Sequence, residues 1–428
     1  MADAASRLKS LLEQLLGVPL PVRIRAWDGS QAGPPGAPVL IVRNRRAVRR
    51  LLFKPGELGL ARAWVAGDLE IEGDLYTALK LMSGLVWERG EDARTLVQTL
   101  RDPEARAAAR GLLRLAGPPI PPAPPREEVR RRRHLHTRRS DSRAISHHYD
   151  VGNDFYEIVL GPSMVYSCAY WEEDGTLESA QRDKLELVCR KLALTPGQRL
   201  LDVGCGWGSM AIHAAREHGV SVVGVTLSQE QAAYARKRIA DEGLTDRVEI
   251  RVQDYRDVTD GPYDAISSIG MAEHVGAERY LEYARALYAL LRPGGRLLNH
   301  QIARRPHRDE SAYHVDEFID AYVFPDGELA PLGTTVTQLE RAGFEVRDVE
   351  SIREHYARTL RRWVANLEAG WPRAVRLTSP GRARVWQLYM AASALAFEGS
   401  RIGVNQVLAV RTPESGESGL PLRSRTWT

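Results

Sequence analysis

From about Arg199 onward, apolar segments rich in β-branched residues alternate with amphipathic segments of helical spacing. This alternation predicts right-handed βαβ units and a mostly parallel, doubly wound α/β sheet, because parallel neighbours need a crossover helix between them. FEVRDVESI and VNQVLAVRT are typical of closing strands, and the helices expected between Leu360 and Ser400 would be an insertion. The strands expected before them are RLLDVGCG, VSVVGVTLS, VEIRVQDY, YDAISSIGM and RLLNHQIA.

The first of these strands runs into a glycine-rich turn, LDVGCGWGSMA, which opens a helix. In a doubly wound sheet, ligands bind at the carboxyl ends of the strands, and glycine lets the backbone approach them closely. The spacing D-x-G-x-G-x-G, set by Asp202, Gly204, Gly206 and Gly208, is not the dinucleotide spacing. It resembles the first motif of S-adenosylmethionine-dependent methyltransferases, which implies that Asp202 orients the loop facing the methionine part of the cofactor.

The tips of the next two strands carry further candidates for a nucleotide site. The second strand ends in Thr226 without the acid that often binds ribose hydroxyls, and Gln231 follows five residues later. After the third strand, Asp254 can accept a hydrogen bond from an adenine amino group, and Tyr255 can stack on the ring. The missing acid counts against a generic methyltransferase and makes the remaining motifs more informative.

Length and composition limit the other possibilities. The chain has 428 residues, which suits two or three domains. Cys168, Cys189 and Cys205 are too few for a disulfide framework, so a reducing compartment fits. No segment has the length of a membrane span or the pattern of a signal peptide. The sequence therefore predicts a cytoplasmic protein, soluble or peripheral at the inner face of the membrane.

Residues 1–115 predict a small α+β domain with a helix over 8–16, strands over 22–27 and 39–43, and a helix-turn-helix over 58–82. Residues 116–144 predict a linker, since PPIPPAPP cannot continue a helix or a central strand. The arginine run that follows fits either a solvated tether or a patch for anionic lipid headgroups, and nucleic acid would attract the same charges. The catalytic domain is expected over 145–412, with a tail over 413–428.

Nine segments follow one another in order over residues 145–412: HHYDVGNDFY, VYSCAYW, ESAQRDKLELVCRKL, LDVGCGWGSMA, VTLSQEQ, QDYRDV, EHVGAERY, YVFPDGEL and HYARTLRRW. Together they resemble the cyclopropane fatty acid synthase family, which includes the mycolic acid methyltransferases. By this resemblance, the T-L-S-x-x-Q run is the family's own replacement for the missing acid, and residues 1–115 resemble the N-terminal domain of the longer, phospholipid-acting members.

The resemblance implies a class I methyltransferase fold with a helical lipid-site insertion, S-adenosylmethionine as methyl donor, and a bicarbonate ion in the active site. The implied cofactor contacts are Tyr166, Ser167, Gly204, Gly206, Thr226, Gln231, Asp254 and Tyr255. The positions implied for bicarbonate are Cys168, Glu273, His300, Ile302 and Tyr356, with Cys168 and Ile302 acting through backbone groups. His147 and His148 have no third ligand at a recognisable spacing, so no metal is expected.

The implied reaction is methyl transfer to the cis double bond of an unsaturated phospholipid acyl chain, followed by proton loss from a carbocation. Loss with ring closure gives a cyclopropane, whereas loss after a hydride shift gives a 10-methylene chain, the precursor of 10-methyl branched acids. Family members usually carry phenylalanine at Ala272 and leucine at Asn299, and both changes adjoin the proposed base in the sequence. The full-length layout resembles the actinobacterial methylene-forming branch, which favours the methylene product.

Two other classes of function remain open. An RNA or small-molecule methyltransferase would use the arginine run for charge but would need a polar nucleophile site. A non-catalytic lipid-binding protein would have no need of intact Gly204, Gly206, Glu273 and His300. The expected partners are an anionic phospholipid surface and a separate reductase, with no nucleic acid, and the resemblance is compatible with a homodimer.

Overall fold

The computed structural model describes residues 3–86, 102–129, 151–310, 313, 315–325, 327–423 and 425. The chain divides into two compact units. The first holds residues 1–130 together with 316–323 and 379–395, and the second holds residues 131–315, 324–378 and 396–428. Two segments from the catalytic half of the sequence therefore belong to the first unit. Among the described residues, no helix is long and apolar enough to cross a membrane.

The first unit contains a four-stranded sheet in the order β2-β1-β3-β4, with β1 and β3 parallel. The segment after Val65, where only a turn was expected, contains a strand, β4. Its four residues pair with β3, and Leu69 is buried. Helix α1 begins at a cap where Asp3 accepts from the Ser6 amide, and it ends at Gly17 with φ 69°. The elements are α1 (Ala4–Leu16), β1 (Arg23–Arg25), β2 (Gln31–Ala32), β3 (Val39–Val42), α2 (Arg45–Phe53), α3 (Glu57–Val65), β4 (Leu69–Glu72), α4 (Leu75–Val86), α6 (Pro103–Ala116), α14 (Glu317–Tyr322) and α18 (Pro380–Glu398), whose last residues enter the second unit.

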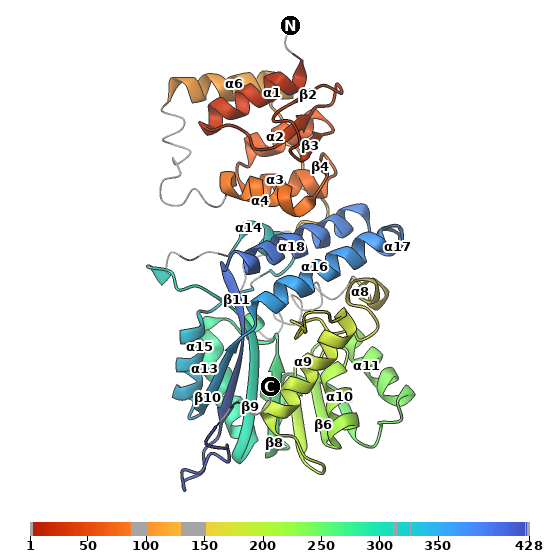
Figure 1. Ribbon diagram of the computed structural model, residues 1–428, viewed down its shortest axis with the longest axis vertical. Coiled ribbons are helices and arrows are strands. Elements are labelled where there is room, and N and C mark those ends of the chain that lie inside the picture. The colour runs from red at the N-terminus through yellow and green to blue at the C-terminus, as the bar shows by residue number, and fades with distance from the viewer. Residues whose placement is uncertain are drawn as a thin grey trace. The chain divides into compact units, whose positions relative to one another are not determined.

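The second unit is built on a seven-stranded sheet in the order β10-β11-β9-β8-β5-β6-β7 (Figure 1). Strands β5 to β9 are parallel, and β11 runs antiparallel to both β9 and β10. The predicted doubly wound α/β fold is confirmed. Its strands are β5 (Arg199–Val203), β6 (Ser221–Thr226), β7 (Val248–Val252), β8 (Tyr263–Ile269), β9 (Leu291–Arg304), β10 (Glu345–Ser351) and β11 (Ile402–Val410).

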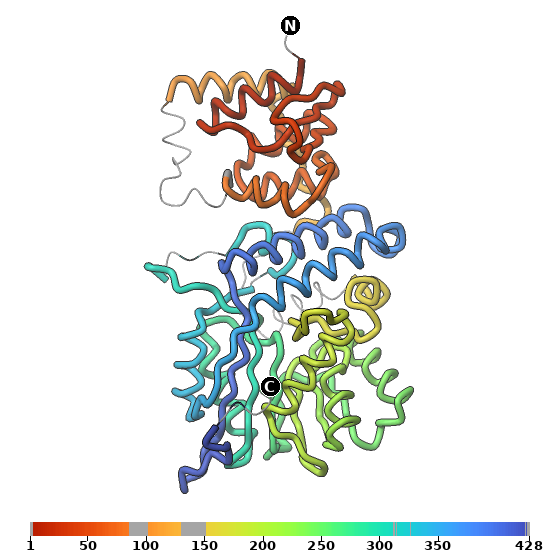
Figure 2. Tube along the Cα trace, viewed as in Figure 1, coloured from red at the N-terminus to blue at the C-terminus, as the bar shows by residue number. Residues whose placement is uncertain are grey.

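Helices cover both faces of this sheet, as the ribbon and the Cα trace show (Figures 1 and 2). One apolar core lies between the sheet and α9, α10 and α11, and a second lies under α13 and α15. The helices are α8 (Asn153–Leu160), α9 (Leu177–Leu192), α10 (Ser209–His218), α11 (Gln229–Asp241), α12 (Ala272–Val275), α13 (Tyr280–Leu290), α15 (Leu332–Arg341), α16 (Arg353–Ala369) and α17 (Trp371–Leu377), with 3-10 turns η2 (Tyr255–Asp257) and η3 (Ala277–Arg279).

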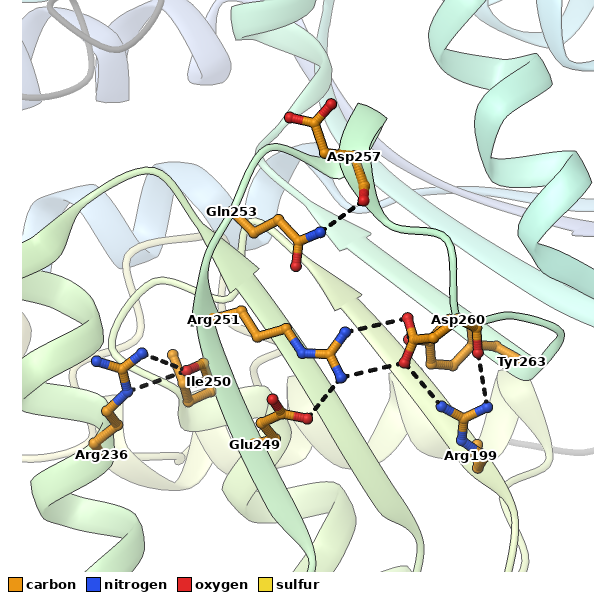
Figure 3. Close-up of polar contacts among 9 residues, drawn as sticks. All are labelled: Arg199, Arg236, Glu249, Ile250, Arg251, Gln253, Asp257, Asp260 and Tyr263. Atoms are coloured by element: carbon orange, nitrogen blue, oxygen red, sulfur yellow. Dashed lines mark hydrogen bonds and ion pairs between the residues drawn. The ribbon is translucent and has the colours of Figure 1, made fainter.

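The winding of the sheet reverses at β5, which pairs with β6 on one side and β8 on the other. Such a reversal leaves a crevice outside the carboxyl ends of the strands, where doubly wound proteins bind ligands. The residues that follow β5, β6, β7 and β8 meet at this crevice. At the opposite end of the strands, Asp260 accepts from both Arg199 and Arg251 and ties β5, β7 and the β7–β8 loop together (Figure 3).

Candidate active site

The glycine turn after β5 is shaped by positive φ angles at all three glycines. Gly204, Gly206 and Gly208 have φ of 76°, 53° and 80°, values that favour glycine. A Cβ on Gly204 would lie 2.3 Å from Met271 Cγ, so the turn passes directly under that side chain. A Cβ on Gly206 would meet no atom within 4 Å. Gly206 therefore presents bare backbone to open space, as a loop that approaches a ligand must.

A pocket lies over this turn, and it gathers nine of the ten predicted cofactor residues. Gly208 is the exception. Its Cβ position would lie 3.1 Å from Ala235 Cβ, so glycine at this position lets α10 begin close to α11 rather than facing the pocket. The predicted residues that line the pocket are Tyr166, Ser167, Asp202, Gly204, Gly206, Thr226, Gln231, Asp254 and Tyr255.

Hydrogen bonds hold the strand-tip residues in place. Thr226 Oγ1 donates to Gln231 Oε1 over 3.0 Å, which joins the end of β6 to the first turn of α11. Asp254 accepts from Arg256 Nε over 2.8 Å and from Nη2 over 2.5 Å. Gln253 Nε2 donates to the Asp257 carbonyl over 2.7 Å and fixes the turn between them (Figure 3). The pocket wall is thus ordered by the protein's own contacts.

Two buried charged groups face the same pocket. Asp202 Oδ1 accepts from Ser267 Oγ over 2.7 Å, while its buried Oδ2 has no hydrogen-bond partner among the described residues. Burial raises the pKa of Asp202 to about 6. Lys184 Nζ donates to Ser167 Oγ over 3.0 Å, and burial lowers the pKa of this lysine to about 8. A cofactor that carries both an ammonium and a carboxylate group complements this pair.

The sequence analysis did not select Lys184. The signal was present, because Lys184 falls on the same helical stripe as the apolar residues Ala180, Leu187 and Val188. A lysine on an apolar stripe is either paired or functional, since burying an unpaired ammonium is costly.

Glu273 and His300 form a second group of buried polar residues near the pocket. Glu273 lies on α12, whose neighbours Met271, His274 and Val275 line the pocket. Its Oε1 accepts from the Ile302 amide over 2.7 Å, whereas its buried Oε2 has no partner in the described part of the chain. Burial raises the pKa of Glu273 to about 7. This carboxyl group can therefore exchange a proton near neutral pH.

The hydrogen bonds of His300 define where its proton resides. Lys191 Nζ donates to Gln406 Oε1 over 2.8 Å, which leaves the Gln406 amide nitrogen facing His300 Nδ1 at 3.3 Å. Lysine can only donate, so the amide orientation is fixed and Nδ1 must accept. Burial, with the charges of Lys184 and Lys191, lowers the pKa of His300 well below its usual value. His300 is thus a neutral imidazole with its proton on Nε2, which is buried and unpartnered among the described residues.

Backbone contacts bring the other predicted catalytic residues to this group. Ile302 pairs with Val404 on β11, and Val404 accepts from the Ile352 amide over 3.0 Å. Cys168 Sγ in turn lies 3.7 Å from the Ile352 carbonyl, just before helix α16. Tyr356, on the first turn of α16, packs against Phe397 with ring centroids 4.7 Å apart. These contacts link the predicted residues only in steps, and none of the five is among the described residues that line the cofactor pocket.

Two findings change details of the predicted site, and some predicted residues are not described. The N–H of Ile302, predicted to contact a bound ion, donates to Glu273. Asn299 was predicted to adjoin the base, but its side chain lies on the face of β9 opposite His300, because side chains alternate along a strand. There it donates to Gln301 and accepts from Tyr283. His147, His148 and the arginine run at 130–133 lie outside the described residues.

The fold and the pocket define an S-adenosylmethionine-dependent methyltransferase, and comparisons with known proteins give its family. Residues 136–407 match the family model described as mycolic acid cyclopropane synthetase, and the chain belongs to this family. It is 45% identical over 415 residues to a probable fatty acid methyltransferase of Mycobacterium tuberculosis, covering 94% of each chain. It is 32% identical over 432 residues to the tuberculostearic acid methyltransferase of the same organism, covering 96% of this chain and 92% of the relative.

A solved structure supports the same assignment. The mycolic acid cyclopropane synthase CmaA1, complexed with SAH and CTAB, matches with a TM-score of 0.60 and 34% identity. The match covers 63% of this chain and 98% of that one. The chain is therefore a lipid-directed methyltransferase of the family that makes cyclopropane and methylene fatty acids.

Proposed function

We propose that the protein transfers the methyl group of S-adenosylmethionine to the cis double bond of an unsaturated, oleoyl-type phospholipid acyl chain. The observation that carries the proposal is that two buried atoms, Glu273 Oε2 and His300 Nε2, have no hydrogen-bond partner among the described residues, and that Glu273 is next to His274, which lines the cofactor pocket. A methyltransferase acting on a nitrogen or oxygen nucleophile has less need of a buried proton acceptor, because such atoms release a proton to water readily. Methyl transfer to an alkene leaves a carbocation, and a carbon-bound proton must then be removed.

Aromatic side chains gather at one wall of the cofactor pocket, where Tyr166 and Trp207 line it. Tyr166 lies between Tyr156 and Trp363, at ring-centroid distances of 5.6 and 5.4 Å. Tyr156 also packs on Trp207 at 4.7 Å. Aromatic faces stabilise a nearby cation by roughly 0.5–2 kcal/mol each. Burial of these rings also excludes water, which would otherwise capture the cation.

The residues present fit a bound bicarbonate ion. His300 Nε2–H can donate to an anion, and Glu273 Oε2 can accept from a hydroxyl group, so the two buried atoms offer the donor and the acceptor that a hydrogen-bonded oxyacid anion needs. When bound, bicarbonate would supply a base that does not itself alkylate easily. Glu273 would hold or release a proton at Oε2, and Tyr356 and Cys168 would bound the site from the side of α16.

For the product we propose the 10-methylene chain, and the second candidate is the cyclopropane. The nearly full-length similarity to the tuberculostearic acid methyltransferase favours the first. The similarity of the catalytic part to a cyclopropane synthase favours the second. The position of Asn299 on the far face of β9 removes one of the two residue-level reasons for the methylene product. Ala272 packs in the core under α13, the helix that also contacts Asn299, so the product proposal depends on the similarity to the tuberculostearic acid methyltransferase.

We also propose that the protein acts at an anionic phospholipid surface on the cytoplasmic side, with a reductase consuming a methylene product. Arg130–Arg133 would supply roughly 1 kcal/mol of attraction per residue near such a surface. Replacing all four by alanine should reduce co-sedimentation with anionic vesicles, most strongly at low salt. Unchanged sedimentation would argue against this surface.

The activity is tested by incubating the purified protein with labelled S-adenosylmethionine and dioleoyl phospholipid liposomes. Distearoyl liposomes, which lack the double bond, are the matched control. Fatty acid methyl esters are then separated, and a labelled C19 methylene or cyclopropane ester from the oleoyl sample alone supports the proposal. Equal labelling of both liposomes, or label in the headgroup, would contradict it.

A further inference from the structure

A cluster of metal-ligating side chains lies between α9 and α10, outside the active site. Glu186 and Cys189 lie on α9, and His213 and His218 lie on α10. The two helices pack side by side (Figure 1). Helix α10 begins at Ser209 beside the cofactor pocket; His213 lies at its middle and His218 at its far end, and neither histidine lines the pocket.

The distances within the cluster suit a small cation. The thiol of Cys189 and one ring nitrogen each of His213 and His218 all lie within 4.8 Å of one another. Glu186 Oε2 lies 3.2 Å from His213 Nε2 and 3.0 Å from His218 Nε2. A tetrahedral zinc ion with bonds of about 2.0–2.2 Å to nitrogen and oxygen separates these ligand atoms by about 3.3–3.5 Å. Small side-chain rotations would bring the sulfur into the same shell.

We propose that Glu186, Cys189, His213 and His218 form a structural Zn²⁺ site. Sulfur and imidazole donors select zinc over magnesium or calcium, which prefer oxygen. One thiolate and one carboxylate neutralise the two positive charges of the ion, so the partly buried site carries no net charge. Glu186 Oε1 accepts from Arg190 over 2.8 Å, and this contact would orient the carboxylate from outside.

Binding would replace the thiol proton and release it to solvent. Each imidazole donates its Nε2 proton to Glu186 in the metal-free protein, so it would bind zinc through Nε2 as the other neutral tautomer, with its proton on Nδ1. The ion would join the last turn of α9 to the end of α10. Helix α9 carries Lys184 and precedes β5 in the sequence, and α10 follows the glycine turn after β5. The proposal is independent of the catalytic reaction.

The test uses untagged, full-length protein that has been treated with a chelator and then titrated with ZnCl₂ by calorimetry. We expect one zinc per chain, and at least a roughly 100-fold loss of affinity in Cys189→Ser, which removes the thiolate ligand. Cys205→Ser, at another buried cysteine, is the control and should bind as the wild type does. His218→Gln, at a partly exposed position, is a second ligand variant that is less disruptive to the core.

Cobalt provides an independent readout. Co²⁺ in the wild-type protein should show a thiolate charge-transfer band and the intense visible bands of a tetrahedral site, and Cys189→Ser should lose the first. Circular dichroism of the metal-free variants verifies that they fold. Absence of zinc uptake by the wild type, or equal affinity in Cys189→Ser, would overturn the proposal and show that the four side chains are held by hydrogen bonds alone.

Discussion

Replacing Glu273 by glutamine separates the chemical role of this side chain from its structural role. The substitution keeps an oxygen that can accept from the Ile302 amide, the contact that measures 2.7 Å in the wild type. It removes the ability of Oε2 to hold a proton. Turnover should fall by roughly 100-fold or more, the range expected for loss of a positioned proton-transfer group. Affinity for S-adenosylmethionine should change little, because Glu273 is not among the residues that line the cofactor pocket.

The same substitution should stabilise the protein at alkaline pH. Burial raises the pKa of Glu273 from 4.5 to about 7, so the folded state binds this proton more tightly than the unfolded state does. The stability that the proton contributes is complete below about pH 4.5 and is lost as the pH rises through about 7. The difference between these two pKa values corresponds to at most about 3–4 kcal/mol. At pH 8, Glu273→Gln should therefore be more stable than the wild type by up to that amount.

Both effects are measured on one preparation. Turnover is followed with labelled cofactor and oleoyl liposomes, cofactor affinity by calorimetry, and stability by urea unfolding at pH 6 and pH 8. Glu278→Gln, on the exposed side of the adjoining turn, is the control and should match the wild type in all three. A Glu273→Gln protein that loses affinity and rate equally, or that is less stable at pH 8, would refute this reasoning.

Three further predictions concern the residues around this group. Gly206→Ala and Gly197→Ala both place alanine at positive φ, at 53° and 88°, and should each cost about 1–2 kcal/mol of stability. Only Gly206→Ala should weaken cofactor binding, measured by calorimetry. Equal cofactor affinity in the two variants would contradict the open face assigned to Gly206. Gln406→Glu should move the His300 proton from Nε2 to Nδ1, because a carboxylate can only accept. ¹⁵N NMR of the imidazole reports the tautomer, and turnover should fall by about 10-fold or more. An unchanged tautomer would refute the hydrogen-bond chain from Lys191 through Gln406 to His300. The wild-type kcat/KM should rise with pH through about 7 as Glu273 loses its proton, and this limb should disappear in Glu273→Gln; its persistence would assign the limb to another group.

Much of the second unit could be predicted from the sequence because its signals are local. The strand pattern and the D-x-G-x-G-x-G spacing act over a few residues, and the turn they predict lies where a doubly wound sheet binds ligands. The side of β9 that Asn299 faces was missed because the residue was judged by its place in the sequence next to His300. The position of Lys184 against Ser167, and of α14 and α18 in the first unit, depends on packing between distant segments.

The cluster of Glu186, Cys189, His213 and His218 was missed for a related reason. Its members come from two helices separated by strand β5, and neither helix alone shows a metal-binding spacing. Gly208 is the opposite case. It belongs to the glycine motif, yet its environment beside Ala235 shows a packing role.

The fate of the methyl hydrogens tests the central claim, that the methyl group joins an alkene carbon and then gives up one proton to the buried group around Glu273 and His300. The protein is supplied with S-adenosylmethionine whose methyl group carries three deuterium atoms, together with oleoyl phospholipid liposomes. Mass spectrometry of the C19 ester should show two deuterium atoms retained, for either the methylene or the cyclopropane product. Retention of all three, or deuterium found outside the acyl chain, would contradict the account.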